Sequence, residues 1–231
     1  MINLRTNCEL YLAMNENADN YNVSSLIGSI TGTASRYTST MHTDGKVDGG
    51  FEFLGRFPDY YLTLSSKITL TEPYTIAFFY RDYYQGETAS FCGEQVGNSK
   101  IQYFDAGATG YIIFWNDAGE SLVYNRSDFP TGDDTWHSVL LTSVGGIQKM
   151  ERDNITIFPF ANNWNTAGIS IDIIGAKTAS LQNIVCDLDL FGLWSRALEF
   201  FPVTEQYLYS QGTEILSTIP RAIHHYKQMA R

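Results

Sequence analysis

The heptapeptide TIAFFYR, Thr75 to Arg81, shows the alternation that decides the fold class. Ile76, Phe78 and Tyr80 share one face, and this period of two is that of a β-strand, where successive side chains point to opposite sides of a sheet. Similar short patterns follow in IQYFD, YIIFWN, ESLVYN, TWHSVLLT, ITIFPF and GISIDIIG, separated by turn-rich pieces such as DAGATG, NDAGE and PTGDD. A spacing of about ten residues per strand predicts an all-β chain folded as an antiparallel sandwich or barrel.

Composition supports the same class. The chain has 231 residues, of which 14% are aromatic and 17% charged, with 19 glycines, and this balance favours strands and tight turns over helices. We expect one domain over residues 1–211, followed by a tail, 212–231, whose composition permits a short docking helix. The Asn-, Ser-, Thr- and Gly-rich region 15–50 is expected to be a long irregular excursion, which is either functional or a surface wrap.

Several classes of partner are disfavoured by the sequence. The formal net charge of −10 lacks the clustered Lys and Arg that bind phosphate backbones, so we expect no nucleic acid. There is no apolar run long enough for a membrane span, and the first residues lack the pattern of a secretory signal. Cys8, Cys92 and Cys186 are too far apart for a disulfide framework or a zinc motif, so they are interpreted as buried thiols.

The stretch DLDLFGLWSRAL, Asp187 to Leu198, begins as an alternating strand and then becomes apolar on both faces. We expect Asp189 to lie at an edge near a turn, and the Arg-Ala-Leu ending to leave the sheet and start a helical turn. The residues expected to face the core are Leu188, Leu190 and Trp194, with Phe191 and Leu193 covered by neighbouring chain.

Five motifs in order resemble the laminin-G-like and pentraxin-like branch of the concanavalin A-like lectin and glucanase superfamily. They are LYLAMNENADN, DGKVDGGFEF with DYYLTL, EPYTIAFFYR, DDTWHSVLLTSVGGIQKMERDNITI and DLDLFGLWSRAL. Trp136, His137 and Val139 match the Trp-His-x-Val strand of that family, and the resemblance covers about residues 8–211. It implies a jelly-roll β-sandwich of the concanavalin A-like kind, in a family that contains both sugar-binding modules and glucanases.

Catalytic patterns are missing. The Glu-x-Asp-x-x-Glu string of the glucanase relatives does not occur, although Asp187 and Asp189 share a strand face at roughly 7 Å, given the rise per residue of a strand. A solvated or turn-capping interpretation of that pair is favoured. The four histidines lie in no recognisable nucleophile setting, and no Gly-x-Ser-x-Gly elbow is present. We therefore predict that the chain is not an enzyme.

Calcium is the one cofactor that the sequence leaves open as an alternative to binding none. In the pentraxin pattern an acidic pair follows the Ile-Ile-Gly strand, but here IDIIG is followed by Ala176, Lys177 and Thr178, and a lysine argues against a cation site. We expect no cofactor and no metal, with calcium held by the Asp44 or Asp117 turns as the alternative.

Sugar binding on such a sandwich needs an aromatic platform together with amide, carboxylate or backbone groups for the hydroxyls. In the segment ANNWN, a tryptophan is surrounded by asparagines in an expected loop. Its ring either binds a ligand or packs back over the edge of the sandwich. The candidate ligand-binding residues are Trp164, Asn162, Asn163, Tyr83, Tyr84, Asn116 and Asp117.

The expected function is non-catalytic glycan recognition or adhesion. A lectin-like sandwich with neither an export signal nor disulfides suggests a bacteriophage virion, with the protein at the particle surface as a fibre or capsid decoration. An extracellular location is the alternative. The expected partners are a glycan or host-surface polysaccharide and other virion proteins; homo-oligomerisation is left open. The alternative function is a purely structural virion protein that attaches to capsid or tail without sugar.

Overall fold

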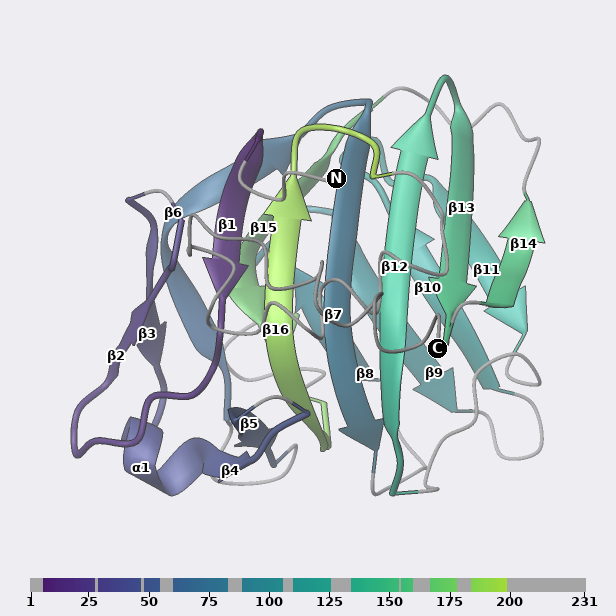
Figure 1. Cartoon of the computed structure of the whole chain (residues 1–231). Coiled ribbons are helices and arrows are strands. Elements are labelled where there is room, and N and C mark those ends of the chain that lie inside the picture. The colour runs from purple at the N-terminus through teal and green to yellow at the C-terminus, as the bar shows by residue number, and fades with distance from the viewer. Residues whose placement is uncertain are drawn as a thin grey trace, which may run out of the picture.

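The computed structural model consists of two stacked antiparallel sheets (Figure 1). It describes residues 6–27, 29–46, 48–54, 60–82, 89–105, 110–125, 134–153, 155–159, 167–177 and 184–198. The sequence prediction of an all-β antiparallel sandwich is confirmed. The predicted boundary at residue 211 and the tail 212–231 lie outside the described residues. None of the helices in the described ranges has the length and apolar character needed to cross a membrane.

The first sheet, sheet A, lies in front in Figure 1 and has the order β14-β13-β12-β7-β16-β5-β4, with β1 also pairing with β16. Its strands are β1 (Cys8–Leu12), β4 (His42–Asp44), β5 (Gly49–Phe53), β7 (Tyr74–Asp82), β12 (Trp136–Val144), β13 (Ile147–Arg152), β14 (Ile155–Pro159) and β16 (Cys186–Trp194). The predicted segment TIAFFYR falls within β7, a central strand.

The second sheet, sheet B, lies behind it and has the order β11-β10-β9-β8-β15-β6-β3-β2. Its strands are β2 (Asn22–Ser24), β3 (Thr31–Ala34), β6 (Leu62–Leu70), β8 (Ala89–Gly93), β9 (Lys100–Asp105), β10 (Gly110–Trp115), β11 (Ser121–Asn125) and β15 (Ile169–Ile174). A short helix, α1 (Thr38–Met41), leads into β4. The prediction that residues 15–50 form an irregular excursion was therefore wrong, because this region supplies three strands, the start of a fourth and a helical turn.

The main core fills the space between the sheets. Ile76, Phe78 and Tyr80 of β7 face it as predicted, and they meet residues such as Phe91 and Ile112 of sheet B. The ring of Phe78 lies 5.0 Å from that of Phe91 between centroids, so aromatic packing joins the layers. The free thiols Cys92 and Cys186 are buried, as predicted, and Cys8 is partly buried.

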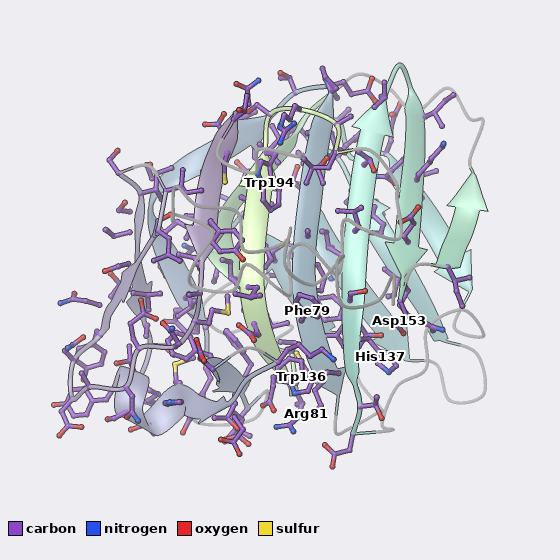
Figure 2. The ribbon with its side chains drawn as sticks, viewed as in Figure 1. Phe79, Arg81, Trp136, His137, Asp153 and Trp194 are labelled. Atoms are coloured by element: carbon purple, nitrogen blue, oxygen red, sulfur yellow. The ribbon has the colours of Figure 1, made fainter. Side chains whose placement is uncertain are left out.

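A second apolar cluster lies on the outer face of sheet A. Its fully or nearly buried members are Tyr11, Ala13, Ala77, Phe79, Leu140, Leu190, Trp194 and Leu198. Figure 2 shows Trp194 and Phe79 on this face of the sheet. Both faces of β7 and β16 are therefore covered, which explains why the sequence of the last strand is apolar on both sides.

The predicted orientation of the last strand was partly wrong. Leu188 faces the main core, but so do Phe191 and Leu193, whereas Leu190 and Trp194 belong to the outer cluster. The register of β16 against β7 shifts between Asp189 and Gly192, and Leu190 adopts a φ of 49°. This bulge places two successive residues on the same side and reverses the alternation after it.

The two aspartates of this strand are fully buried. Burial shows that the solvated interpretation of the pair was wrong. Asp189 lies within β16, and its Oδ2 lies close to Gly45 in the turn between β4 and β5, so a turn-capping role of Asp189 stays a prediction. After the strand, Thr75 Oγ1 donates to the Arg196 carbonyl at 2.8 Å and accepts from the Leu198 amide at 2.8 Å. The chain thus leaves the sheet in a bend, and the helical turn expected after Leu198 falls outside the described residues.

Candidate functional site

The structure describes two of the seven predicted ligand-binding residues, Asn116 and Asp117. The others, Tyr83, Tyr84, Asn162, Asn163 and Trp164, lie outside the described residues. Asn116 and Asp117 follow β10 directly, in the turn that leads to β11. The candidate site is therefore built outward from this turn.

Asn116 closes the turn through its side chain. Its Oδ1 accepts from the Glu120 amide at 2.9 Å and its Nδ2 donates to Glu120 Oε2 at 3.1 Å, while its own carbonyl accepts from the Gly119 amide at 2.9 Å. Gly119 has a φ of +78°, the left-handed conformation that glycine adopts without steric cost. Asn116 is fully buried, so its amide acts here as the internal brace of the turn.

Asp117 ties this turn to two other strands. Its Oδ1 accepts from the Ser170 amide at 3.0 Å and from the Ser99 hydroxyl, and its Oδ2 accepts from the Ser170 hydroxyl at 3.0 Å. The Asp117 amide donates to the Gly168 carbonyl at 2.9 Å. These bonds hold the end of β10 against the start of β9 and β15. Direct contact of Asn116 and Asp117 with a ligand stays a prediction.

Trp115, the last residue of β10, is the aromatic group that this turn presents. Phe114 before it belongs to the main core, so Trp115 points to the outer face of sheet B, where it is partly exposed. Its indole Nε1 is buried and has no hydrogen-bond partner in the described part of the chain. An unpaired buried N–H costs about 1–3 kcal/mol, so this donor is an unsatisfied polar group beneath the exposed part of the ring.

Lys100 lies beside Trp115 on the neighbouring strand. The two residues are paired across β9 and β10, and the Lys100 Nζ lies 4.8 Å from the centroid of the indole. Gly93 is the partner of Lys100 on the other side, and a Cβ there would lie 3.0 Å from the Lys100 Cβ. The glycine therefore leaves space for the lysine.

A second lysine, Lys177, approaches the same ammonium group. It follows β15, and its ammonium lies close enough to that of Lys100 to repel it. Burial first, and then the charge of Lys177, lower the pKa of Lys100 to about 8. Neither lysine forms an ion pair with a carboxylate among the described residues, whereas Lys67 nearby contacts Glu94 at 2.8 Å.

Lys100 is expected to titrate near pH 8, well below an ordinary lysine. The measurement is NMR of the chain after reductive ¹³C-methylation, with the Lys100→Arg variant used to assign the resonance. Because the folded-state pKa lies below the unfolded value, the unfolded chain binds more protons between pH 8 and about 10.5, and the contribution of Lys100 to stability rises across that window. A Lys100 signal that shifts only above pH 10 contradicts the described environment.

The aspartate pair considered for hydrolysis lies on the opposite sheet. Arg81 on β7 holds Asp187 through its Nη2 at 2.6 Å and its Nε at 3.0 Å. The Arg81 guanidinium also lies 5.1 Å from the centroid of Trp136, and Figure 2 shows the two side chains together. The buried carboxylate of Asp187 is therefore committed to an ion pair within the fold.

His137 is likewise engaged in a structural contact. Its Nδ1 lies 2.6 Å from Asp153 Oδ2, and Asp153 Oδ1 accepts from the Ser138 amide at 2.9 Å (Figure 2). Burial alone would raise the pKa of Asp153, but the hydrogen bonds from His137 and Ser138 outweigh it and hold this pKa below its usual range. The contact fixes the end of β13 against β12.

The calcium alternative receives no support from ligand geometry. Within the described ranges, no group of three or more His, Cys, Asp or Glu side chains is arranged to hold a metal ion. The Asp117 oxygens accept hydrogen bonds from serines, as described above.

The sequence predicted the turn with Asn116 and Asp117 as part of a site, but it did not predict that Lys100 and Lys177 lie near it. Lys100 and Lys177 come from segments far apart in the chain. The pairing of β9 with β10 places Lys100 beside Trp115, and Lys177 approaches Lys100 from the segment after β15. The one available signal was the alternation of YIIFWN, which places Trp115 opposite to the inward Phe114.

No family model matches the chain, and no curated protein matches it. Among solved structures, the chain is similar to the binding domain of Paraclostridial Mosquitocidal Protein 1, with a TM-score of 0.61 and 14% identity over 89% of this chain and 52% of that one. It is also similar to domain 4 of AbnA, an extracellular GH43 arabinanase from Geobacillus stearothermophilus, in complex with arabinotriose, with a TM-score of 0.59 and 17% identity over 86% of this chain and 97% of that one.

A third similar structure is the ligand-binding domain of botulinum neurotoxin serotype D in complex with N-acetylneuraminic acid. Its TM-score is 0.60 and its identity is 13%, over 89% of this chain and 51% of the other. The chain thus spans about half the length of the two toxin domains. At these identities the similarity establishes the fold, a β-sandwich shared with binding domains, while the concanavalin A-like assignment stays a prediction.

Proposed function

We propose that this chain is a non-catalytic glycan-recognition domain that holds a sugar against Trp115. The observation that carries the proposal is a partly exposed indole at the end of β10, which lies beside a hydrogen-bonded turn and has the Lys100 Nζ 4.8 Å from its ring centroid. A pyranose presents an apolar C–H face to such a ring.

Two further observations support recognition without catalysis. The carboxylate pair that could have served a glycosidase includes Asp187, which Arg81 holds in a buried ion pair. The similar sandwiches of the arabinanase domain and the neurotoxin domain were solved with arabinotriose and N-acetylneuraminic acid.

The biological setting is a separate part of the proposal. We place the domain at the surface of a bacteriophage particle, as a fibre or capsid decoration that contacts host polysaccharide and other virion proteins. The alternative is a structural virion protein that binds no sugar. If the protein is incorporated into particles but binds none of the glycans tested, that result would favour the structural alternative.

The test is binding to an array of bacterial surface polysaccharides by the whole chain and by Trp115→Ala. We expect the variant to lose affinity about 10- to 100-fold, since it removes the stacking surface. Tyr37→Ala is the matched control, because Tyr37 is an aromatic residue with 45% exposure away from the site. A folded Trp115→Ala that binds as the unchanged chain does would overturn the role of Trp115.

A further inference from the structure

Lys100 and Trp115 lie side by side on the outer face of sheet B, and Lys177, from a third segment, approaches Lys100. Trp115 ends β10, Lys100 begins β9 and Lys177 follows β15. The Lys100 Nζ lies 4.8 Å from the centroid of the indole, and the nearby Lys177 ammonium repels it. All three side chains are partly exposed, so a ligand can reach them from solvent.

Two neighbouring ammonium groups repel each other, and a nearby carboxylate would normally offset this. In this chain acidic residues outnumber basic ones by 25 to 15, yet neither lysine is ion-paired within the described residues. The acids around the site have other contacts: Glu94 pairs with Lys67, Asp117 accepts from serines, and Asp172 Oδ1 accepts from the Gln95 amide at 2.8 Å.

We infer that Lys100 and Lys177 form an anion subsite beside Trp115, so that the sugar recognised there carries a negative charge. This inference rests on the proposed function and deepens it. The ligand class is an acidic saccharide, with either a sugar carboxylate or a sulfate ester as the charged group.

An acidic sugar complements the three groups in charge and in shape. Each ammonium offers donors for charge-assisted hydrogen bonds to anionic oxygens, and an anion between the two lysines removes their repulsion. The indole beside them accepts the apolar face of the same sugar ring. A neutral sugar would satisfy the indole but would leave the lysine pair uncompensated.

The experiment compares three sets of immobilised glycans: neutral, carboxylated with uronic or sialic acids, and sulfated. The proteins are the whole chain, Lys100→Met, Lys177→Met and Lys67→Met. We expect preference for one acidic set over the neutral set, and a loss of about 10- to 100-fold in affinity for that set in each site variant. Lys67→Met is the matched control, because its exposed ammonium already has Glu94 as a partner.

The acidic set that is preferred identifies the charged group. Thermal melting checks folding, and Lys177→Met serves as the second variant if Lys100→Met fails to fold. Equal binding of neutral and acidic glycans, or unchanged binding by folded lysine variants, overturns the anion subsite while leaving a Trp115 sugar site in place. Binding to no glycan in any set overturns the proposed function as well.

Discussion

Arg81→Met is expected to lower the free energy of unfolding by about 3–5 kcal/mol, because it leaves the buried carboxylate of Asp187 without its cation. Asp187 is fully buried, and Arg81 is its partner through two nitrogens at 2.6 and 3.0 Å. The substitution also removes the guanidinium that lies over Trp136. For a chain of this size we expect a fall of roughly 10 °C in the melting temperature, measured by circular dichroism.

Two controls separate the burial of charge from the simple loss of an ion pair. Lys67→Met removes a pair whose ammonium is half-exposed although the Glu94 carboxylate is largely buried, so the melting temperature should fall clearly less than in Arg81→Met, because water reaches this contact. The double variant Arg81→Met with Asp187→Leu replaces both charges by apolar groups and should recover much of the loss. If Arg81→Met has the same melting temperature as the unchanged chain, the buried carboxylate of Asp187 does not need this cation for stability.

The two-layer fold could be predicted from sequence because its signal is local. The strands β7, β10, β12 and β15 were identified from alternation within six to nine residues, and alternation follows from strand geometry alone. The region 15–50 was misjudged because its strands are only three to five residues long, too short to repeat a pattern.

The orientation of β16 depended on information that the local pattern does not contain. Asp187 and Asp189 mark one face in its first half, but from Leu190 onward the residues are apolar on both faces. The bulge at Leu190 therefore reverses the alternation where no polar residue reveals the change. The burial of Asp187 was missed for a related reason. Arg81 lies far away in sequence, and only the pairing of β16 with β7 places the two charges together.

The candidate site was predictable only as a turn. Asn116 and Asp117 stand out in sequence because Asn, Asp and Gly favour turns, but their role as braces depends on Ser99 and Ser170 in other strands. The proximity of Lys100 and Lys177 is likewise a product of tertiary pairing. Groups brought together by a sheet leave little trace in a single sequence.

Trp194→Ala is expected to lower the free energy of unfolding by about 3–5 kcal/mol, the usual cost of removing a large aromatic side chain from a packed interior. Trp194 is fully buried in the outer cluster and meets Tyr11 in an edge contact, with ring centroids 6.2 Å apart. Urea denaturation of the whole chain measures the change. An effect below about 1 kcal/mol would mean that this face contributes little to stability.

Gly192 explains how the indole fits against the sheet. A Cβ at this position would lie 2.2 Å from Cη2 of Trp194, so the ring packs directly on the glycine backbone. Gly192→Ala alone should cost about 1–3 kcal/mol through overpacking. In the Trp194→Ala background the added methyl group enters space that the ring has left, so its cost should fall below about 1 kcal/mol and the cycle should give a coupling energy of about 1–2 kcal/mol. Additive costs would place the indole away from Gly192 and would contradict the bulged register of β16, because that register sets Gly192 and Trp194 on the same outer face.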